Sequence, residues 1–579
     1  MSADPTSLFA KSLFFGLIPE DLAFPYPRLA DSDTADSLEL FLESIRRFGA
    51  SQIDSRQIDE TAHIPYDLIQ GLRRLGLFGM SLPEACGGSG LDHRMFCRVM
   101  QELAGIDASV ALTLGAHQTV GTRGLLLYGT EEQKRRYLPL LASGEWIAAF
   151  ALTEPEAGSD AASITTRAEL SADGSHFLLT GRKQWITNGG LARLFTVFAK
   201  TPVETSGRRR DRITAFLVER AFGLESGSEE DKLGIRGSSA TSLYLDGVKV
   251  PRENVLGELG GGFKIAQEVL GFGRLSLAAG CIGCARTALR LALDHARNRR
   301  QFGKPIADFD MIRSKFAQMA IDLYACESMV YLTAGVVDAG VTDFGIEAAC
   351  CKVFASEMLW RAVNETMQIC GGSAYMRAYP YERFLRDARI NLIFNGTNEI
   401  LRLFISLGGM AAPGERLAQL PAAIRRPVSS YGLVADFVLQ KLRTTVYGER
   451  LSRAHPHLRR EAAILEDYVI ELEQVVDRVL RKHGGRIVEF QHIHRRVADV
   501  VIDLYALVAC IARASSRLER EAGGDPDAVT RLCRAFAAQA RDRLRRNFRR
   551  VGSKDDEALT EIAEALYAAG GYAGEALEE

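Results

Sequence analysis

The segment FALTEPEAGSD, residues 150–160, stands where the character of the chain changes. Before it, from Asp36 to about Leu141, apolar residues recur with the period of α-helices. After Trp146 the pattern becomes short apolar runs separated by turns. Four of these runs predict β-strands, at residues 177–181, 194–199, 213–218 and 242–245. Because no helical pattern lies between them, they indicate an antiparallel sandwich or barrel.

Helical patterns return at Gly262 and continue to the end of the chain. Residues 263–295 form one long pattern, and small residues fill its middle, which lets neighbouring helices approach closely. Further helices are predicted at residues 429–451 and 465–481. The whole pattern predicts an irregular arm over 1–35, a helical domain over 36–145, a β domain over 146–258, a second helical domain over 259–412, a linker over 413–427 and an additional helical domain over 428–579.

Bulk properties narrow the class of protein. At 579 residues the chain is too long for one hydrophobic core, and its net charge of −2 gives no general attraction to nucleic acid. Its ten cysteines lack metal or redox spacing, which indicates buried, reduced thiols. The start of the chain does not read as a signal or transit peptide, and no window approaches a membrane-spanning helix, so a cytoplasmic protein is expected. The charged run RRRDR, residues 208–212, is expected to be a solvated loop.

Two segments could serve a planar polar ring. The loop at residues 150–160 offers hydroxyls and backbone N–H groups, which a flavin needs around its polar edge. The segment KQWITNGG, residues 183–190, adds the aromatic face of Trp185 and the hydroxyl of Thr187. Taken alone, any turn has the first composition, and a buried tryptophan in a sheet explains the second equally well.

Together these strings resemble the acyl-CoA dehydrogenase family. The resemblance covers roughly residues 40–410, in the family's order, and includes KLGIRGSS at 232–239, RQFG at 300–303, QICGG at 368–372 and FNGTNEI at 394–400. The extra C-terminal domain and the segment FAKSLF at 9–14 resemble the very-long-chain branch. The resemblance implies an α+β protein with the acyl-CoA dehydrogenase fold: a helical domain, a middle β-barrel, a helical bundle and the additional helical domain.

The resemblance also implies FAD as the cofactor. Residues expected to line the flavin of their own subunit are Phe150, Leu152, Thr153, Gly158, Ser159, Trp185, Thr187 and Thr397. Residues expected to reach the FAD of a neighbouring subunit, in a homodimer or higher homo-oligomer, are Arg300, Gln301, Phe302, Gln368, Gly371 and Gly372. Bare backbone at Gly371 and Gly372 would let a pyrophosphate approach closely. The chain departs from the family at Ala374, where a further glycine is usual.

A fatty acyl-CoA is the implied substrate, with electron transfer flavoprotein as the implied electron acceptor. Ser159, Arg274 and Asn395 are expected to contact the substrate, with Arg274 toward its CoA end. The backbone N–H of residue 395 is expected to polarise the thioester carbonyl. This donor does not depend on the side chain at 395.

The family's catalytic base is missing. Removal of the weakly acidic α-proton needs a positioned carboxylate, which most branches place directly before Gly396-Thr397. This chain has Asn395 there, and an amide has no useful basicity. The alternative family position, directly before Arg274, holds Gly273. Glu399 lies one turn away and is expected to be structural, since active relatives also carry an acid there.

Four hypotheses are compatible with the missing base. The chain could be an FAD-dependent dehydrogenase of long-chain fatty acyl-CoA with a relocated base, or a binding pseudoenzyme or complex subunit. It could also be a flavoprotein with changed chemistry, or a variant in which the base was removed by engineering. In the additional domain, the stretch RDRLRRNFRR at 541–550 could meet anionic lipid at the inner membrane face through its arginines and through Leu544 and Phe548. The alternative is a solvated helix that pairs with acids elsewhere in the chain.

Overall fold

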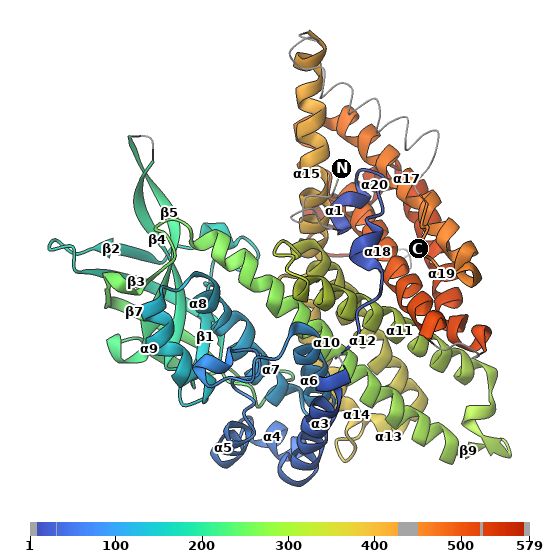
Figure 1. Cartoon of the computed structure of the whole chain (residues 1–579), viewed down its shortest axis with the longest axis horizontal. Coiled ribbons are helices and arrows are strands. Elements are labelled where there is room, and N and C mark those ends of the chain that lie inside the picture. Colours follow the sequence, from blue (N-terminus) through green and yellow to red (C-terminus); the bar gives the residue numbers. More distant parts are fainter. Residues whose placement is uncertain (1–8, 30–31, 206, 426–449, 521–524, 573–579) are drawn as a thin grey trace. The chain divides into compact units, whose positions relative to one another are not determined.

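The computed structural model describes residues 9–29, 32–205, 207–425, 450–520 and 525–572 (Figure 1). These residues fall into two compact units. Unit 1 contains Pro25–Ile400, and unit 2 contains Phe9–Phe24 together with the described residues from Leu401 onward.

Unit 1 begins with helices. They are α3 (Ser32–Gln52), α4 (Ser55–Thr61), α5 (Tyr66–Arg74), η1 (Glu84–Cys86), α6 (His93–Ile106), α7 (Ala108–Ala116), the π-helical turn η2 (His117–Gly121), α8 (Arg123–Tyr128) and α9 (Glu131–Ala142). Polar side chains cap their starts, as when Asp92 accepts a hydrogen bond from the N–H of Met95 and Asp107 from that of Val110. The predicted helical domain is thus present.

The middle of unit 1 is a sheet. Its elements are β1 (Ala148–Ala151), η3 (Ala161–Ser163), β2 (Arg167–Leu170), β3 (His176–Thr187), β4 (Leu194–Thr205), β5 (Arg208–Glu219), η4 (Arg220–Phe222), β6 (Glu225–Glu229), β7 (Ala240–Pro251), η5 (Arg252–Asn254) and β8 (Val255–Leu256). The eight strands β1 to β8 form one sheet. Seven of them follow the order β6-β7-β3-β2-β4-β5-β8, and β1 pairs with β4. The β1–β4 and β2–β4 pairs are parallel, so the expectation of an antiparallel sandwich or barrel is corrected to a mixed sheet with β6 and β8 at its ends.

The charged run at residues 208–212 was expected to be a loop, and this expectation is wrong. It is the first part of β5, and its register with β4 reaches the pair Thr205↔Arg208. The side chains of residues 208–212 are all exposed, whereas those of 213–219 are buried. A strand with both faces in water has no apolar alternation, which is why the sequence pattern hides it.

Helices follow the sheet. They are α10 (Gly262–Asn298), α11 (Asp310–Asp338), α12 (Gly345–Cys370), α13 (Gly372–Tyr375), α14 (Tyr381–Arg389) and α15 (Asn398–Arg425), with the strands β9 (Arg300–Gln301) and β10 (Lys304–Pro305) and the turns η6 (Ile306–Asp308) and η7 (Ile390–Leu392) between them. Residue 283 shows why α10 needs small side chains, because a Cβ built on Gly283 would lie 1.9 Å from the Gln101 carbonyl oxygen of α6. Two of these helices, α10 and α11, are long and apolar enough to cross a membrane, contrary to expectation, but their apolar windows are 78% and 67% buried. That burial is typical of core helices.

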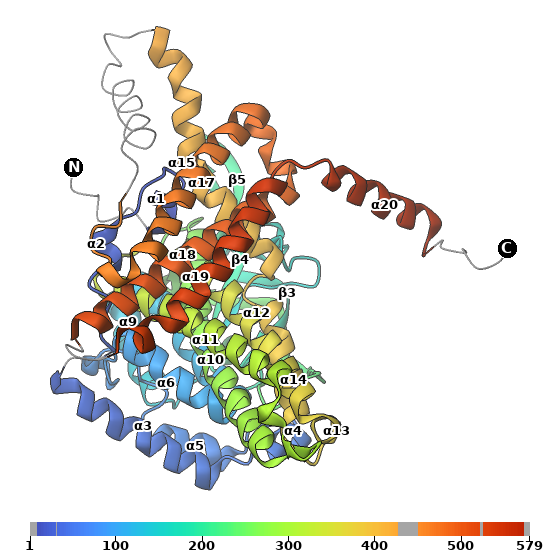
Figure 2. The ribbon, with the colours of Figure 1, turned by 90° about the vertical axis from the view of Figure 1, so that its right-hand side faces the viewer.

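Unit 2 is helical. It contains α1 (Phe9–Leu13), α2 (Glu20–Ala23), α15 from Leu401, η9 (Pro456–Leu458), α17 (Arg459–His483), η10 (Gly484–Glu489), α18 (Gln491–Arg520), α19 (Pro526–Arg550) and α20 (Asp555–Ala569). Figures 1 and 2 show α17, α18 and α19 lying side by side. The helix α20 buries none of its side chains. The predicted helix at 429–451 lies almost wholly outside the described residues.

Two expectations about unit 2 are corrected. The arm over residues 1–35 contains α1 and α2, and Phe9 is buried with its ring 5.8 Å from that of Tyr505. The supposed linker is helical through Arg425, because α15 runs on. Gly409 in this helix marks close packing, since a Cβ there would lie 2.0 Å from the ring of Phe14.

The interleaved apolar residues of α19 are also placed differently from the expectation. Leu544 is fully buried and Phe548 is 8% exposed, with its ring stacked on that of Tyr468. They pack inside unit 2, and the exposed residues of the stretch 541–550 are Arg541, Asp542, Arg545, Arg546, Arg549 and Arg550. The cysteines behave as expected: none of the ten, all of which lie in the described residues, forms a disulfide bond, and all but Cys86 are buried.

Candidate functional site

Two positions that could hold a base meet in space. A Cβ built on Gly273 of α10 would lie 3.3 Å from the Nδ2 atom of Asn395 and 3.0 Å from Val120. The side chain at 395 therefore reaches toward the space that a side chain at 273 would take. The two positions thus border the same space.

The backbone at this point is left-handed. Asn395 has φ of 55° and Gly396 has φ of 90°. Among residues with a Cβ, asparagine and aspartate adopt this conformation most readily. Among the described residues, the non-glycine residues with positive φ are Ala62, Trp185, Asn188, Ile235, Phe302 and Asn395. Half of them are predicted site residues, and such strained positions cluster at functional sites.

Two buried basic side chains hold this turn. Arg274 is 8% exposed and donates from Nε to the carbonyl oxygen of Asn395 at 3.3 Å. Lys352 is fully buried and donates from Nζ to the carbonyl oxygen of Gly396 and to Oδ1 of Asn398, both at 2.8 Å. Burial lowers the pKa of Arg274 to about 10. The pKa of Lys352 is lowered to about 7, mainly by burial. The expected contact of Arg274 with substrate stays a prediction.

Thr397 and Glu399 begin α15. The hydroxyl of Thr397 accepts a hydrogen bond from the N–H of Ile400 at 3.2 Å, as a helix cap does. Glu399 is exposed in the first turn, where an acidic side chain suits the helix dipole. Its placement suits the expected structural role, and contact of Thr397 with a flavin stays a prediction.

The two segments expected to bind the flavin, residues 150–160 and 183–190, lie side by side. The N–H of Gln184 donates to the carbonyl oxygen of Thr153 at 3.0 Å, which sets Trp185 and Thr187 beside the loop that follows β1. Leu152 belongs to the hydrophobic core next to this loop, and Phe150 packs against that core. Thr153 and Thr187 are half-buried, Ser159 is exposed, and Trp185 is 60% exposed. Hydroxyls, backbone donors and an open aromatic face fit the polar edge and ring of a flavin.

A buried ion pair between Lys183 and Glu154 fixes the loop that follows β1. Lys183 and Glu154 are 0% and 2% exposed, and Nζ lies 2.7 Å from the carboxylate. Burial alone would raise the pKa of Glu154, but Lys183 and hydrogen bonds from Thr165 and Thr166 outweigh it, and the pKa falls to about 2. Lys183 also donates to the carbonyl oxygen of Leu152 at 3.2 Å, so the pair fixes the loop backbone.

The π-helical turn η2 was missed by sequence reasoning, and it stands between β1 and α10. His117 is fully buried: Nδ1 accepts from the N–H of Ala148 at 3.0 Å, and Nε2 donates to the carbonyl oxygen of Leu141 at 3.1 Å. Burial lowers the pKa of His117 to about 4, so the ring is neutral. The same turn brings Val120 to Gly273. Such turns occur often at functional sites.

The residues expected to serve a neighbouring subunit gather elsewhere. Ile369, beside Gln368, packs with Ile306, which follows the hairpin of Arg300, Gln301 and Phe302. Phe302 is 94% exposed, and a Cβ built on Gly371 or Gly372 would meet nothing within 4 Å. Ala374 is fully buried, so its methyl does not line this surface.

The length of α10 separates these two sets. At about 1.5 Å per residue, Asn298 lies roughly 36 Å along the helix from Arg274. The second set therefore lies far from Arg274 within one chain. The expectation that this set serves the cofactor of a neighbouring subunit comes from the family resemblance and stays a prediction.

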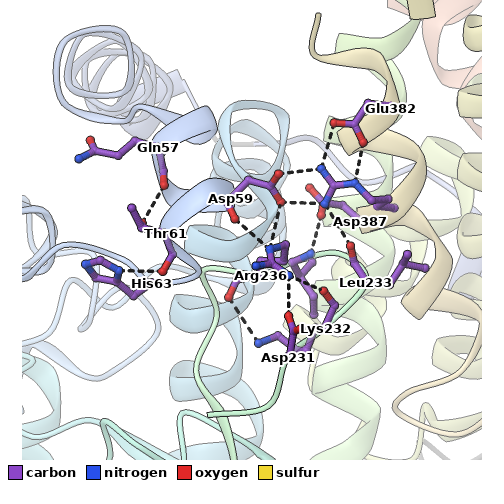
Figure 3. Close-up of polar contacts among 12 residues, drawn as sticks. Gln57, Asp59, Thr61, His63, Asp231, Lys232, Leu233, Arg236, Glu382 and Asp387 are labelled. Atoms are coloured by element: carbon purple, nitrogen blue, oxygen red, sulfur yellow. Dashed lines mark hydrogen bonds and ion pairs between the residues drawn. The ribbon is translucent and has the colours of Figure 1, made fainter. Parts of the chain in front are cut away.

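The string KLGIRGSS makes a joint within unit 1, and Figure 3 shows its contacts. Arg236 donates from Nε to the carbonyl oxygen of Asp59 in α4 at 2.9 Å, and the N–H of Ile235 donates to Asp387 of α14. Arg386 completes the joint with two hydrogen bonds to the Asp59 carboxylate, at 2.7 and 2.8 Å. A Cβ on Gly234 would lie 2.3 Å from the Arg386 backbone, which explains the glycine.

Among the residues that the structure describes, no cluster of three or more His, Cys, Asp or Glu could hold a metal ion. The arrangement is instead that of a flavoprotein of three domains with a fourth helical domain. The chain belongs to the acyl-CoA dehydrogenase family. It matches the family's N-terminal domain over residues 35–145, its middle domain over 149–248 and its C-terminal domain over 260–409, and the ACAD9/ACADV C-terminal domain over 456–572.

Individual relatives agree with this assignment. The very long-chain specific acyl-CoA dehydrogenase of Rattus norvegicus mitochondria is 42% identical over 558 residues, which cover 95% of this chain and 85% of the relative. The acyl-CoA dehydrogenase of Bacillus anthracis, solved with FAD, has a TM-score of 0.79 at 31% identity and covers 94% of this chain and 92% of its own. Butyryl-CoA dehydrogenase of Megasphaera elsdenii has a TM-score of 0.62 at 38% identity, over 66% of this chain and all of its own.

Proposed function

We propose that the chain binds FAD and a long-chain fatty acyl-CoA around Asn395 and carries out α,β-dehydrogenation of the acyl chain slowly. The observation that carries this proposal is the left-handed turn at Asn395 and Gly396, held by two buried basic side chains and facing Gly273. When bound, FAD supplies the acceptor for the hydride that leaves the β-carbon. Trp185, Thr187 and the loop after β1 would hold its ring.

The chain's own residues would do the rest. The backbone N–H of residue 395 would donate to the thioester carbonyl and so acidify the α-proton, and it does not depend on the side chain. The proton itself needs a base, and neither Asn395 nor Gly273 supplies a carboxylate. Substrate binding should therefore persist while proton removal is slow.

The absence of a carboxylate at both positions also favours a second candidate, a binding protein that retains FAD and acyl-CoA without turnover. An anaerobic titration of the FAD-bound protein with acyl-CoAs of increasing length separates the two. Slow bleaching of the flavin absorbance supports the dehydrogenase. A spectral shift on binding with no bleaching over hours supports the binding protein, and no response to any acyl-CoA contradicts both.

Partners and location belong to the same proposal. Arg300, Phe302 and Gly371 would complete the FAD site of a second copy in a homodimer or larger homo-oligomer, and electron transfer flavoprotein would take the electrons. We place the protein in the cytoplasm, where its exposed arginines on α19 would contact anionic lipid at the inner face of the membrane.

A further inference from the structure

We propose that Lys352 is a positioning residue that holds the turn at Asn395 and Gly396 in its left-handed form. This inference rests on the proposed function for its effect on the reaction, but its effect on the backbone can be measured separately. Lys352 donates hydrogen bonds to Gly396 and Asn398, and neither residue is an expected flavin or substrate contact. It would act only through the turn.

The geometry defines what Lys352 fixes. Arg274 holds the carbonyl of residue 395, which belongs to the peptide plane between residues 395 and 396. Lys352 holds the carbonyl of residue 396, which belongs to the following plane. Both peptide planes after Asn395 are therefore held by buried donors. The φ angles of 55° and 90° show that the turn is not one that an unsupported chain would favour at Asn395.

A second contact ties this clamp to the next helix. Nζ of Lys352 also donates to Oδ1 of Asn398, whose Nδ2 donates to the hydroxyl of Ser356 at 3.0 Å. Asn398 is the first residue of α15 and is 2% exposed. The lysine thus joins the turn to the start of α15 through the buried side chains of Lys352, Asn398 and Ser356. Burying an amino group at 0% exposure is costly unless it is hydrogen-bonded, and the contacts with Gly396 and Asn398 meet that need.

The sequence supplies a chemical reporter of this clamp. In an Asn-Gly pair, the glycine backbone nitrogen attacks the asparagine side-chain carbonyl, ammonia leaves and a succinimide forms. Water then opens the ring to aspartate or isoaspartate. The attack requires rotation about the Cα–C bond of Asn395, which turns the plane that Arg274 holds and also displaces the Gly396 carbonyl that Lys352 holds. The hydrogen bond from Lys352 should therefore slow the attack. Asn188-Gly189 is a second Asn-Gly pair, buried in the turn that follows β3, and serves as an internal reference.

The test compares Lys352→Met and Lys352→Gln with the parent, all bound to FAD. Peptide mass mapping after incubation at 37 °C should show deamidation at Asn395 at least fivefold faster in Lys352→Met, with Lys352→Gln in between and Asn188 unchanged. Ser356→Ala, which loses a contact to Asn398 but keeps the lysine, is the matched control and should behave like the parent. If Lys352→Met does not fold, Lys352→Gln alone decides. Deamidation at the parent's rate, or equal acceleration at Asn188, overturns the proposal.

A kinetic arm measures the effect on the reaction. In an Asn395→Glu background, Lys352→Met should lower the maximal rate of flavin reduction at least tenfold and change the half-saturating acyl-CoA concentration less than threefold. A loss confined to half-saturation would overturn the positioning role. If the Asn395→Glu parent reduces no flavin, the proposed function fails, while the deamidation result still decides the role of Lys352.

Discussion

Single residues explain why an asparagine can occupy the base position. A left-handed backbone costs most side chains on the order of 1 kcal/mol, and asparagine much less. With φ of 55°, residue 395 suits Asn better than Glu. The present residue therefore favours the local backbone at the expense of the proton-transfer step.

The candidate site was partly readable from the sequence. Strings such as residues 150–160 and 183–190 carry several site residues within a short stretch, so a family resemblance exposes them together. Lys352 and His117 could not be found this way. Lys352 lies 44 residues from its partner Gly396, and His117 lies 31 residues from Ala148, with nothing local to mark either contact. Only the packed structure joins them.

His117 should make the protein sensitive to acid. Its pKa of about 4 lies below the usual value near 6.5, so between these values the unfolded chain binds a proton that the folded chain does not. Stability should fall as pH drops through this window, by about 3 kcal/mol at pH 4. In His117→Gln this contribution disappears, so denaturant unfolding at pH 7 and pH 4 should show a flatter dependence than in the parent. Parallel pH profiles for the two proteins would contradict the assignment.

Elements of secondary structure were predicted best where one face is buried. The long helix at residues 263–295 appears as α10, and the four predicted strands lie within β3, β4, β5 and β7. Expectations failed where composition misleads. Residues 208–212 extend β5, and both faces of that part of the strand are exposed to water. The stretch after residue 408 contains glycine but lies in α15, where Gly409 is close to Phe14.

The glycines of α10 give an element-scale prediction. A methyl at Gly283 would lie 1.9 Å from the Gln101 carbonyl oxygen, so Gly283→Ala should destabilise the protein by about 1–3 kcal/mol through overpacking. Gly280→Ala is the matched control one turn away, where the nearest atom is the Cβ of Ala104 at 3.4 Å. It should be neutral or slightly stabilising, since alanine favours helix over glycine. Chemical denaturation measures both, and equal effects would refute the close approach of α10 and α6.

For the whole molecule, the proposed cofactor contact between subunits can be tested without disturbing the fold. Gly372→Ala adds a methyl where nothing lies within 4 Å, so the melting temperature of the FAD-free protein should not change. FAD affinity, measured by flavin fluorescence, should fall at least tenfold because the backbone approach is blocked. Gly485→Ala, equally open in unit 2, is the control and should keep full affinity. Unchanged affinity in Gly372→Ala would remove this residue from the site.

Membrane contact is the second test at this scale. Leu544 and Phe548 are buried, so binding would depend on exposed arginines alone and be sensitive to salt. Replacing Arg545 and Arg549 together with alanine should weaken flotation with anionic vesicles by about 2 kcal/mol, roughly thirtyfold. Arg486→Ala, an exposed arginine elsewhere in unit 2, should have little effect. Equal flotation of all three proteins, or flotation with neutral vesicles, would contradict an arginine-based contact.

In the proposed function, the turn at residue 395 binds acyl-CoA and lacks only the base. The most direct measurement is the rate of flavin reduction after anaerobic mixing with a long-chain acyl-CoA, in the parent, Asn395→Glu and Asn395→Gln. A general base typically contributes about 10²–10⁴-fold, so Asn395→Glu should be faster by that factor, despite a stability cost of about 1 kcal/mol. Asn395→Gln, matched in size, should stay as slow as the parent. Mass mapping must confirm that Asn395 is intact, and an intact parent that reduces its flavin as fast as Asn395→Glu would contradict the account.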